Sequence, residues 1–149
     1  MRKKRILIPA ILSLSTLSIS PALAAETPQE ARRCDAAIQL ARKVGWLKKD
    51  LSTLRYIMWR ESRCQHDSIG RNRNTLGVVT SQDWGLLQIN DASWVTYLRG
   101  KHIITRKEDL LNPRTNLKAG LILLRYSINE GLDRWHQWRG TSVAGSAVK

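Results

Sequence analysis

Residues 81–90 read SQDWGLLQIN, and this stretch changes from polar to apolar at its middle. Its second half, residues 85–90, is too short for a surface helix and too apolar for a loop, so we expect it to cross the core. Upstream, residues 71–74 are polar turn formers and β-branched residues surround Gly77, a pattern typical of a small hairpin. The stretch therefore predicts a hairpin that ends near Asp83 and leads directly into the core.

Helix signals lie on both sides of this hairpin. Residues 27–30 combine a capping box with a proline at the first helical position, and Gly45 ends the apolar periodicity that follows. Another capping box at residues 105–108 predicts a short helical turn. Residues 112–113 open the longest predicted helix, which Gly131 ends. The expected fold class is α+β, mainly α, with a small β element.

A further helix is predicted to start at residues 50–52, and it carries a carboxyl group on its apolar face. Its buried stripe is expected to contain Leu54, Ile57, Met58 and Glu61. An apolar setting disfavours the charged form of a carboxyl group, which suits a group that donates a proton near neutral pH. The spacing alone favours a structural role for Glu61 over a catalytic one, either an ion pair with Arg60 or Arg63 or a place in an exposed last helical turn.

The N-terminal segment has the pattern of an export signal. Residues 2–5 are all basic, an apolar run follows from Ile6 to about Ile19, and residues 22–24 read Ala-Leu-Ala. We expect residues 1–24 to form a cleaved signal peptide, residues 25–140 the folded domain, and residues 141–149 a disordered tail. The alternative, an uncleaved membrane anchor, would need a longer apolar run. No later segment is apolar enough to span a membrane, so we expect no stable membrane insertion after cleavage.

The chain is strongly basic, with a formal net charge of +13. Removal of the four signal-peptide cations leaves 21 Lys and Arg against 12 Asp and Glu, a net charge of +9. Such a charge favours anionic polymers or surfaces. Export and the absence of a basic tail argue against nucleic acid as the partner. The expected partner is therefore an anionic cell wall. We expect the protein to be a monomer.

Two cysteines, Cys34 and Cys64, are expected to form one disulfide, because an even number in an exported chain usually pairs. The alternative is a metal site that uses both cysteines with His66 and His102. Their spacing matches no standard set of metal ligands, so neither a metal nor another cofactor is expected.

Several motifs occur in an order that resembles the animal-type (c-type) lysozymes. They are Glu61-Ser62, Asn72-Arg73-Asn74-Thr75 with Gly77, residues 81–90, Asn116-Leu117-Lys118-Ala119, and residues 132–138 with two tryptophans. The soluble lytic transglycosylases and related bacterial and phage proteins share the Glu-Ser and Gly-Leu-x-Gln elements. The resemblance implies a lysozyme-like fold in which a β-hairpin lobe flanks an active-site cleft.

The resemblance also implies roles for individual residues. Glu61 matches the general acid and Asp83 the nucleophile or charge stabiliser. The resemblance makes Asn74 and Asn90 polar supports of that carboxylate, and Gln88 the glutamine of the Gly-Leu-x-Gln element. Trp94 matches a sugar-platform residue, and Trp135 matches the tryptophan that packs on the acid. These five residues form the implied substrate-binding set. Capping of the following segment is the alternative role for Asp83, and core packing is the alternative for the tryptophans.

The function implied by the resemblance is cleavage of peptidoglycan at the β-1,4 bond between N-acetylmuramic acid and N-acetylglucosamine. Asp83 favours hydrolysis, as in a muramidase. A lytic transglycosylase that forms 1,6-anhydromuramyl ends is the alternative, although the Ala-Tyr-Asn element common in those enzymes is absent. A cationic, non-catalytic binder of walls or membranes is a third possibility. The residues between Glu61 and Asp83 outnumber those of the animal-type family, so the separation that decides the stereochemistry is open.

Overall fold

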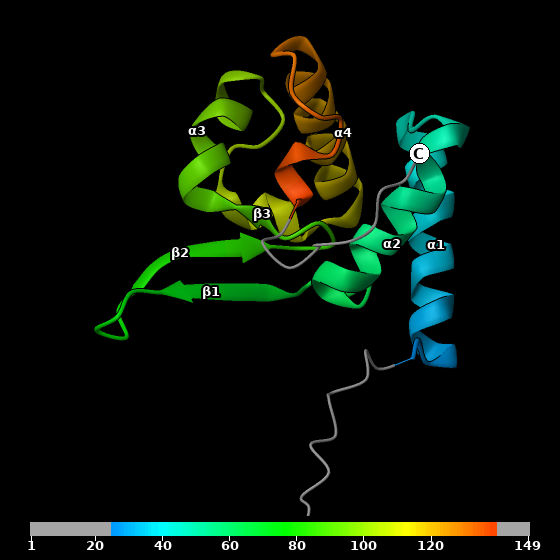
Figure 1. Cartoon of the computed structure of the whole chain (residues 1–149), viewed down its shortest axis with the longest axis horizontal. Coiled ribbons are helices and arrows are strands. Elements are labelled where there is room, and N and C mark those ends of the chain that lie inside the picture. The colour runs from blue at the N-terminus through cyan, green and yellow to red at the C-terminus, as the bar shows by residue number, and fades with distance from the viewer. Residues whose placement is uncertain (1–24, 140–149) are drawn as a thin grey trace, which may run out of the picture.

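The computed structural model describes residues 25–139, in which helices lie above and at one end of a small antiparallel sheet (Figure 1). The predicted signal peptide and the predicted tail lie outside this range. The α-helices are α1 (Pro28–Val44), α2 (Leu51–Ser62), α3 (Asp91–Gly100) and α4 (Pro113–Asn129). Short 3-10 helices are η1 (Lys48–Asp50), η2 (Lys107–Leu111) and η3 (His136–Trp138), and the strands are β1 (Ile69–Arg73), β2 (Val79–Trp84) and β3 (Ile89–Asn90). The predicted α+β, mainly α fold is confirmed.

Helix α1 begins and ends where the sequence predicts. The Thr27 side chain accepts from the backbone of Glu30, the Glu30 side chain accepts from the backbone of Thr27, and Pro28 opens the helix. Gly45 ends the helix with a φ of 105°, a left-handed conformation that glycine adopts without strain. The predicted disulfide between Cys34 and Cys64 is present and joins the middle of α1 to the residues that follow α2.

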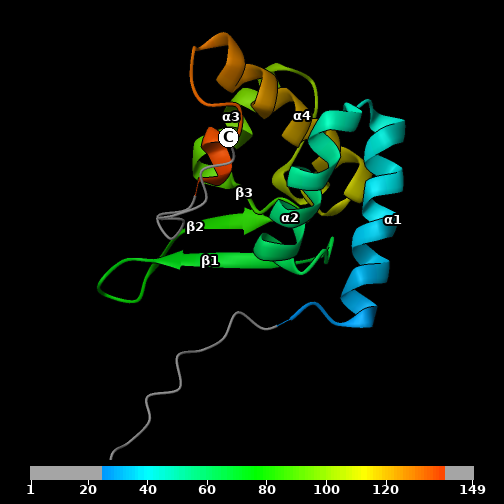
Figure 2. The ribbon, with the colours of Figure 1, turned by 45° about the vertical axis from the view of Figure 1, so that its right-hand side comes forward.

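The β1–β2 hairpin projects away from the helices, and its turn lies at the far end (Figures 1 and 2). The sheet order is β1-β2-β3, with both pairs antiparallel. Gly70 pairs with Asp83 and Asn72 with Ser81, and the register shifts just after Asn72. Asp83 pairs on its other side with Asn90. The hairpin was predicted, whereas the short third strand was not.

The segment after β2 crosses the core as predicted, with Leu86 and Leu87 almost fully buried. Buried Asn116 of α4 satisfies its backbone: the amide oxygen accepts from the Leu87 N–H at 3.0 Å, and the amide nitrogen donates to the Trp84 carbonyl at 2.8 Å. At Gly120, also in α4, an added Cβ would lie 2.2 Å from Leu87. The close packing of α4 thus fixes the path of the chain directly after Asp83.

Helix α3 was missed from the sequence, although Asn90 is a good N-cap residue and caps it through its side chain. The predicted capping box at residues 105–108 is corrected in one detail. Asp109, and not Glu108, accepts the backbone N–H groups of Thr105 and Arg106, because the turn is a 3-10 helix that begins at Lys107. Within residues 25–139, no helix has the length and apolarity needed to cross a bilayer.

Candidate active site

Glu61 lies in the last turn of α2, at the end of the predicted apolar stripe. Leu54, Ile57 and Met58 of this stripe are buried, whereas Glu61 is half-buried. Its Oε1 atom accepts a hydrogen bond from Arg60 Nε at 3.0 Å and also contacts Arg60 Nη2. The ion pair with Arg60, one of the arrangements that the sequence left open, is therefore the one that forms.

The residue after the acid connects α2 to the segment that crosses the core. Ser62 is buried, and its hydroxyl lies 2.8 Å from the carbonyl oxygen of Leu86 and 3.0 Å from that of Met58. Leu86 follows Asp83 by three residues. The segments that carry the two predicted catalytic carboxyl groups are thus joined by a buried polar contact.

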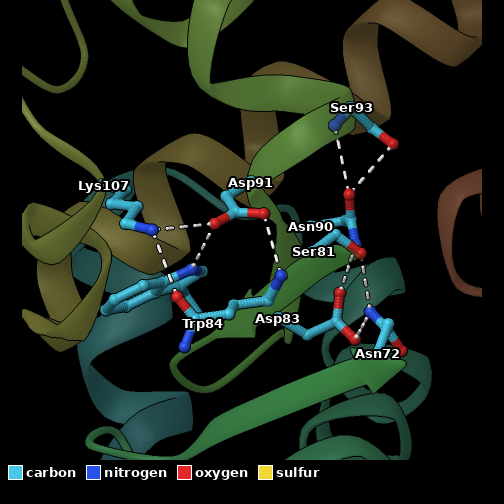
Figure 3. Close-up of polar contacts among 9 residues, drawn as sticks. Asn72, Ser81, Asp83, Trp84, Asn90, Asp91, Ser93 and Lys107 are labelled. Carbon is cyan, nitrogen blue, oxygen red and sulfur yellow. Dashed lines mark hydrogen bonds and ion pairs between the residues drawn. The ribbon is translucent and has the colours of Figure 1, made fainter. Parts of the chain in front are cut away.

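Asp83 is held through both of its carboxylate oxygens (Figure 3). Asn72 Nδ2 donates to Oδ2 and Asn90 Nδ2 donates to Oδ1, each at 2.8 Å. The same two amide nitrogens lie 3.0 Å from the Ser81 hydroxyl oxygen, which closes a ring of four side chains. Because the four residues come from all three strands, the sheet register fixes the orientation of this carboxyl group.

Asn72 takes the place beside Asp83 that the resemblance gave to Asn74. The Asn74 side chain instead accepts from the backbone N–H groups of Leu76 and Val78, both at 3.0 Å, and so holds the turn of the hairpin. Asn72 lies opposite Ser81 in the ladder, which brings its amide within reach of Asp83. The structure therefore brings Asn90, and not Asn74, into contact with Asp83, and substrate binding by Asn74 and Asn90 stays a prediction.

Asn90 and Asp91 link the Asp83 ring to the rest of the fold. Asn90 Oδ1 accepts from the Ser93 backbone N–H at 3.1 Å and caps α3. Asp91 accepts from the backbone N–H of Gln82 at 2.8 Å and from Lys107 Nζ and the Trp84 indole at 3.1 and 3.4 Å. Burial alone would raise the pKa of Asp91, but these three donors outweigh it and lower the pKa. Sequence reasoning missed Asp91 because its partners are distant along the chain.

Gln88 lies close to the Asp83 region but is used locally. Its side-chain nitrogen donates to the carbonyl oxygens of Gly85 and Ser68, at 2.9 and 3.2 Å. Its Oε1 atom lies against Gly70, where an added Cβ would be 2.8 Å away. Gln88 therefore holds the turn between β2 and β3, and its role in substrate binding stays a prediction.

The two C-terminal tryptophans occupy different positions. Trp135 stacks on Trp46 with ring centres 5.9 Å apart, whereas Trp138 is buried and its indole donates to the Leu87 carbonyl. The backbone oxygen of Trp138 accepts from the same Arg60 nitrogen that contacts Glu61. The tryptophan connected to the acid is therefore Trp138, by way of Arg60. Packing of Trp135 on the acid stays a prediction.

Trp94 belongs to a group of three half-buried aromatic rings. It packs edge to face against Tyr97 and Tyr126, with ring centres 5.9 and 5.4 Å apart. An exposed edge of such a group suits stacking on a sugar as well as core packing. The role of Trp94 as a sugar platform stays a prediction.

Two other features concern ligands. A cavity of about 550 Å³ lies at the end of α3 and the start of α4, with Arg99, His102 and Asp109 in its walls, and it includes neither Glu61 nor Asp83. Among residues 25–139, no group of three His, Cys, Asp or Glu side chains is arranged to hold a metal ion.

The mainly helical fold with its small antiparallel sheet is that of the lysozyme-like superfamily, to which the chain belongs. More narrowly, residues 42–144 match the Transglycosylase SLT domain family, and the chain belongs to that family.

The descriptions of the relatives that the chain matches refer to peptidoglycan. Over 89 residues it is 38% identical to a peptidoglycan-binding-like protein of Escherichia coli O157:H7, covering 59% of this chain and 52% of the relative. It is 37% identical over 89 residues to a peptidoglycan-binding-like protein of Escherichia coli K12, covering 59% of this chain and 55% of that relative. The chain thus spans about half the length of these curated relatives. No solved structure matches it.

Proposed function

We propose that this protein cleaves the glycan strands of peptidoglycan, at the β-1,4 bond between N-acetylmuramic acid and N-acetylglucosamine. The observation that carries the proposal is the pair of carboxyl groups in unlike settings, Glu61 half-buried and paired with Arg60 at the end of an apolar helical stripe, and Asp83 in a ring of amides. Glycoside cleavage commonly uses two such groups. The match to the SLT family and the descriptions of the relatives support the same substrate class.

In the proposed mechanism, Glu61 protonates the oxygen of the leaving sugar. Of the two carboxylate oxygens of Glu61, Arg60 contacts only Oε1. Within residues 25–139 the other oxygen, Oε2, has no hydrogen-bond partner. Oε2 is therefore the oxygen that is left free to approach the leaving sugar. Ser62 supports this geometry, because its buried contact with Leu86 fixes the end of α2 against the segment that follows Asp83.

Asp83 is proposed to stabilise the positive charge that develops at the sugar ring as the bond breaks. Its two oxygens are oriented by neutral donors, Asn72 and Asn90, so no cation competes for its negative charge. Preorganised groups of this kind stabilise a transition state without having to reorient during the reaction. The same carboxylate is suited to attack the sugar directly or to orient water.

We propose that water completes the reaction, as in a muramidase, because a second, firmly held carboxyl group is what hydrolysis requires. Transglycosylation is the second candidate, favoured by the description of the matched family. There the muramyl 6-hydroxyl attacks, and the product ends in a 1,6-anhydro sugar.

A digest of purified sacculi separates the two candidates. Mass spectrometry of the released fragments should show reducing muramyl ends after hydrolysis, which are heavier by one water than anhydro ends. If only anhydro ends are found, the protein is a transglycosylase and not a hydrolase. Release of no fragments would contradict both and leave the non-catalytic binder.

We further propose that the protein is exported and acts on the anionic wall. The Cys34–Cys64 disulfide suits an oxidising compartment, and the predicted net charge of +9 favours an anionic polymer. Binding to intact sacculi should weaken as salt rises, because screening reduces such attraction. A pelleting assay at low and high salt measures this, and unchanged binding would contradict a charge-driven partner.

A further inference from the structure

The turn of the β1–β2 hairpin exposes a small aliphatic cluster that the proposed chemistry does not use. The exposed fractions are 84% for Leu76, 58% for Val78 and 39% for Val79. The turn is the part of the hairpin farthest from the helices in both views (Figures 1 and 2). We call residues 74–79 the hairpin tip. The fold leaves most of Leu76 and more than half of Val78 exposed, so these side chains are available for another contact.

The backbone of the hairpin tip satisfies most of its own polar groups. Asn74 accepts from the N–H groups of Leu76 and Val78, and its own N–H donates to the Val78 carbonyl at 2.9 Å. Gly77 donates to the Asn74 carbonyl, and its own carbonyl accepts from Arg73 Nη1 at 2.7 Å. Removing a polar group from water is unfavourable unless it keeps a hydrogen bond. The hairpin tip is thus preorganised to enter an apolar medium.

The charge around the hairpin tip is entirely positive. Between Asp67 and Asp83 the only charged residues in the sequence are Arg71 and Arg73, and both are exposed. An apolar end next to basic side chains matches the boundary of a bilayer, with acyl chains beneath anionic headgroups. Long basic side chains keep their charge at the headgroups while their stems lie on apolar surface.

We propose that the hairpin tip inserts into the surface of an anionic lipid bilayer. A glycan strand has no apolar medium to receive Leu76 and Val78. A protein partner would need roughly 1,000 Å² of complementary surface, whereas this convex tip presents three aliphatic side chains. A bilayer requires no shape complementarity, and it supplies both the apolar layer and the negative charge.

This contact has a consequence for the proposed cleavage, and this step alone rests on the proposed function. Asp83 follows Gly77 by six residues, which at roughly 3.3 Å per residue places it about 20 Å from the turn. A tip anchored in the bilayer would hold the two carboxyl groups close to the membrane. The glycan strands cleaved first would then be those nearest the membrane.

The test is vesicle co-sedimentation of the chain from Ala25 onward, which contains all the described residues and lacks the apolar run of the predicted signal peptide. The probes are vesicles of phosphatidylglycerol with phosphatidylcholine, and vesicles of phosphatidylcholine alone. The variant combines Leu76→Ser and Val78→Ser. Its matched control combines Ile128→Ser and Leu132→Ser, two aliphatics that are 44% and 40% exposed elsewhere.

The tip variant should bind anionic vesicles more weakly by at least about tenfold, since 1.4 kcal/mol corresponds to a factor of ten and burial of even one of its two replaced aliphatic side chains contributes about that much. The control should bind as the parent does, and Arg71→Gln should weaken binding only to the anionic vesicles. Thermal unfolding of each variant verifies the fold. Cleavage of isolated sacculi, which contain no bilayer, should be the same for the tip variant and the parent.

Three results would overturn the proposal: equal vesicle binding by the tip variant and the parent, equal binding of the parent to both kinds of vesicle, or no vesicle binding at all. Sedimentation velocity that shows a parent dimer lost in the tip variant, without vesicle binding, would assign the tip to self-association. Failure to cleave sacculi would count against the proposed function while leaving the vesicle result unaffected.

Discussion

Glu61 and Asp83 are held by opposite kinds of partner. Glu61 is contacted on one oxygen by a charged neighbour, Arg60, which is the residue before it in the same helix. Asp83 is contacted on both oxygens by neutral amides that come from the two neighbouring strands. A helix end therefore holds one carboxyl group locally, and three paired strands hold the other through the tertiary fold.

The difference suggests how the two groups divide the work. A group that must release a proton needs one oxygen unengaged, and Oε2 of Glu61 has no partner in residues 25–139. A group that must face a developing positive charge needs a fixed orientation, which the ring through Asn72, Ser81 and Asn90 provides for Asp83. Four predictions test this comparison, and we take them from the largest expected effect to the smallest.

The largest effect is expected for Glu61→Gln, which removes the proposed proton donor and keeps the shape of the side chain. Release of fragments from sacculi should fall by about 1,000-fold, within the range that general acids contribute. Circular dichroism and thermal unfolding should match the parent. The exposed Glu108→Gln is the matched control and should keep full activity. A Glu61→Gln variant that retains most of the parent's activity would show that Glu61 is not the proton donor.

Asp83→Asn is expected to come next, with a loss of about 100-fold, since preorganised charge stabilisation commonly contributes that much. The variant also places an amide N–H group against the amide donors of Asn72 and Asn90, so the ring loses at least one hydrogen bond. The free energy of unfolding should fall by about 1–3 kcal/mol. Denaturant titration and the sacculus assay measure the two effects. Unchanged activity would show that Asp83 is structural.

Asn72 and Asn74 form a matched pair that tests which asparagine supports Asp83. Asn72→Ala should lower activity by about tenfold, because a hydrogen bond to a charged group contributes roughly 1.5 kcal/mol or more. Asn74→Ala should mainly lower the free energy of unfolding, by about 1 kcal/mol, through loss of its two turn contacts. Steady-state rates and denaturant titration of both variants decide the point. The opposite ranking in activity would return the supporting role to Asn74.

The smallest effect concerns Asp91, a third carboxyl group that is paired with a cation. Its folded-state pKa lies below the ordinary value of 3.8, so its stabilising contribution is complete above about that pH and is lost as the pH falls further. Asp91→Asn should therefore be less stable than the parent at pH 6, and the difference should shrink at pH 3. Denaturant titrations at both pH values measure this. A difference that is constant with pH would contradict the assigned contacts with Gln82, Trp84 and Lys107.

Local signals in the sequence account for much of the fold. The capping box at residues 27–30, the stop at Gly45 and the stripe that ends at Glu61 depend on neighbours within a few residues, and all three occur in the structure. The disulfide also followed, because two cysteines in a chain with a predicted export signal allow one pairing. Helix α3 was missed because its cap, Asn90, is at the same time a partner of Asp83 in the sheet.

The details of the site depend on register and on distant partners, which periodicity does not encode. Asn72 and Asn74 point to the same side of a regular strand, so only the pairing of Asn72 with Ser81 shows which of them reaches Asp83. The link from Arg60 to Trp138 spans 78 residues. Such contacts require the three-dimensional arrangement, so nothing in the sequence indicated that Trp138 is connected to Glu61 through Arg60.

The Cys34–Cys64 disulfide makes the stability of the protein depend on the redox state of its compartment. It ties α1 to the chain three residues after Glu61, across a sequence separation of 30. In the chain-entropy model, a loop of that length contributes about 3–4 kcal/mol, a large share of the 5–15 kcal/mol typical of a domain. A newly made chain in a reducing cytosol would lack that share and would acquire it only after leaving. Under the proposed function, the protein would reach its full stability only in the compartment that holds the wall.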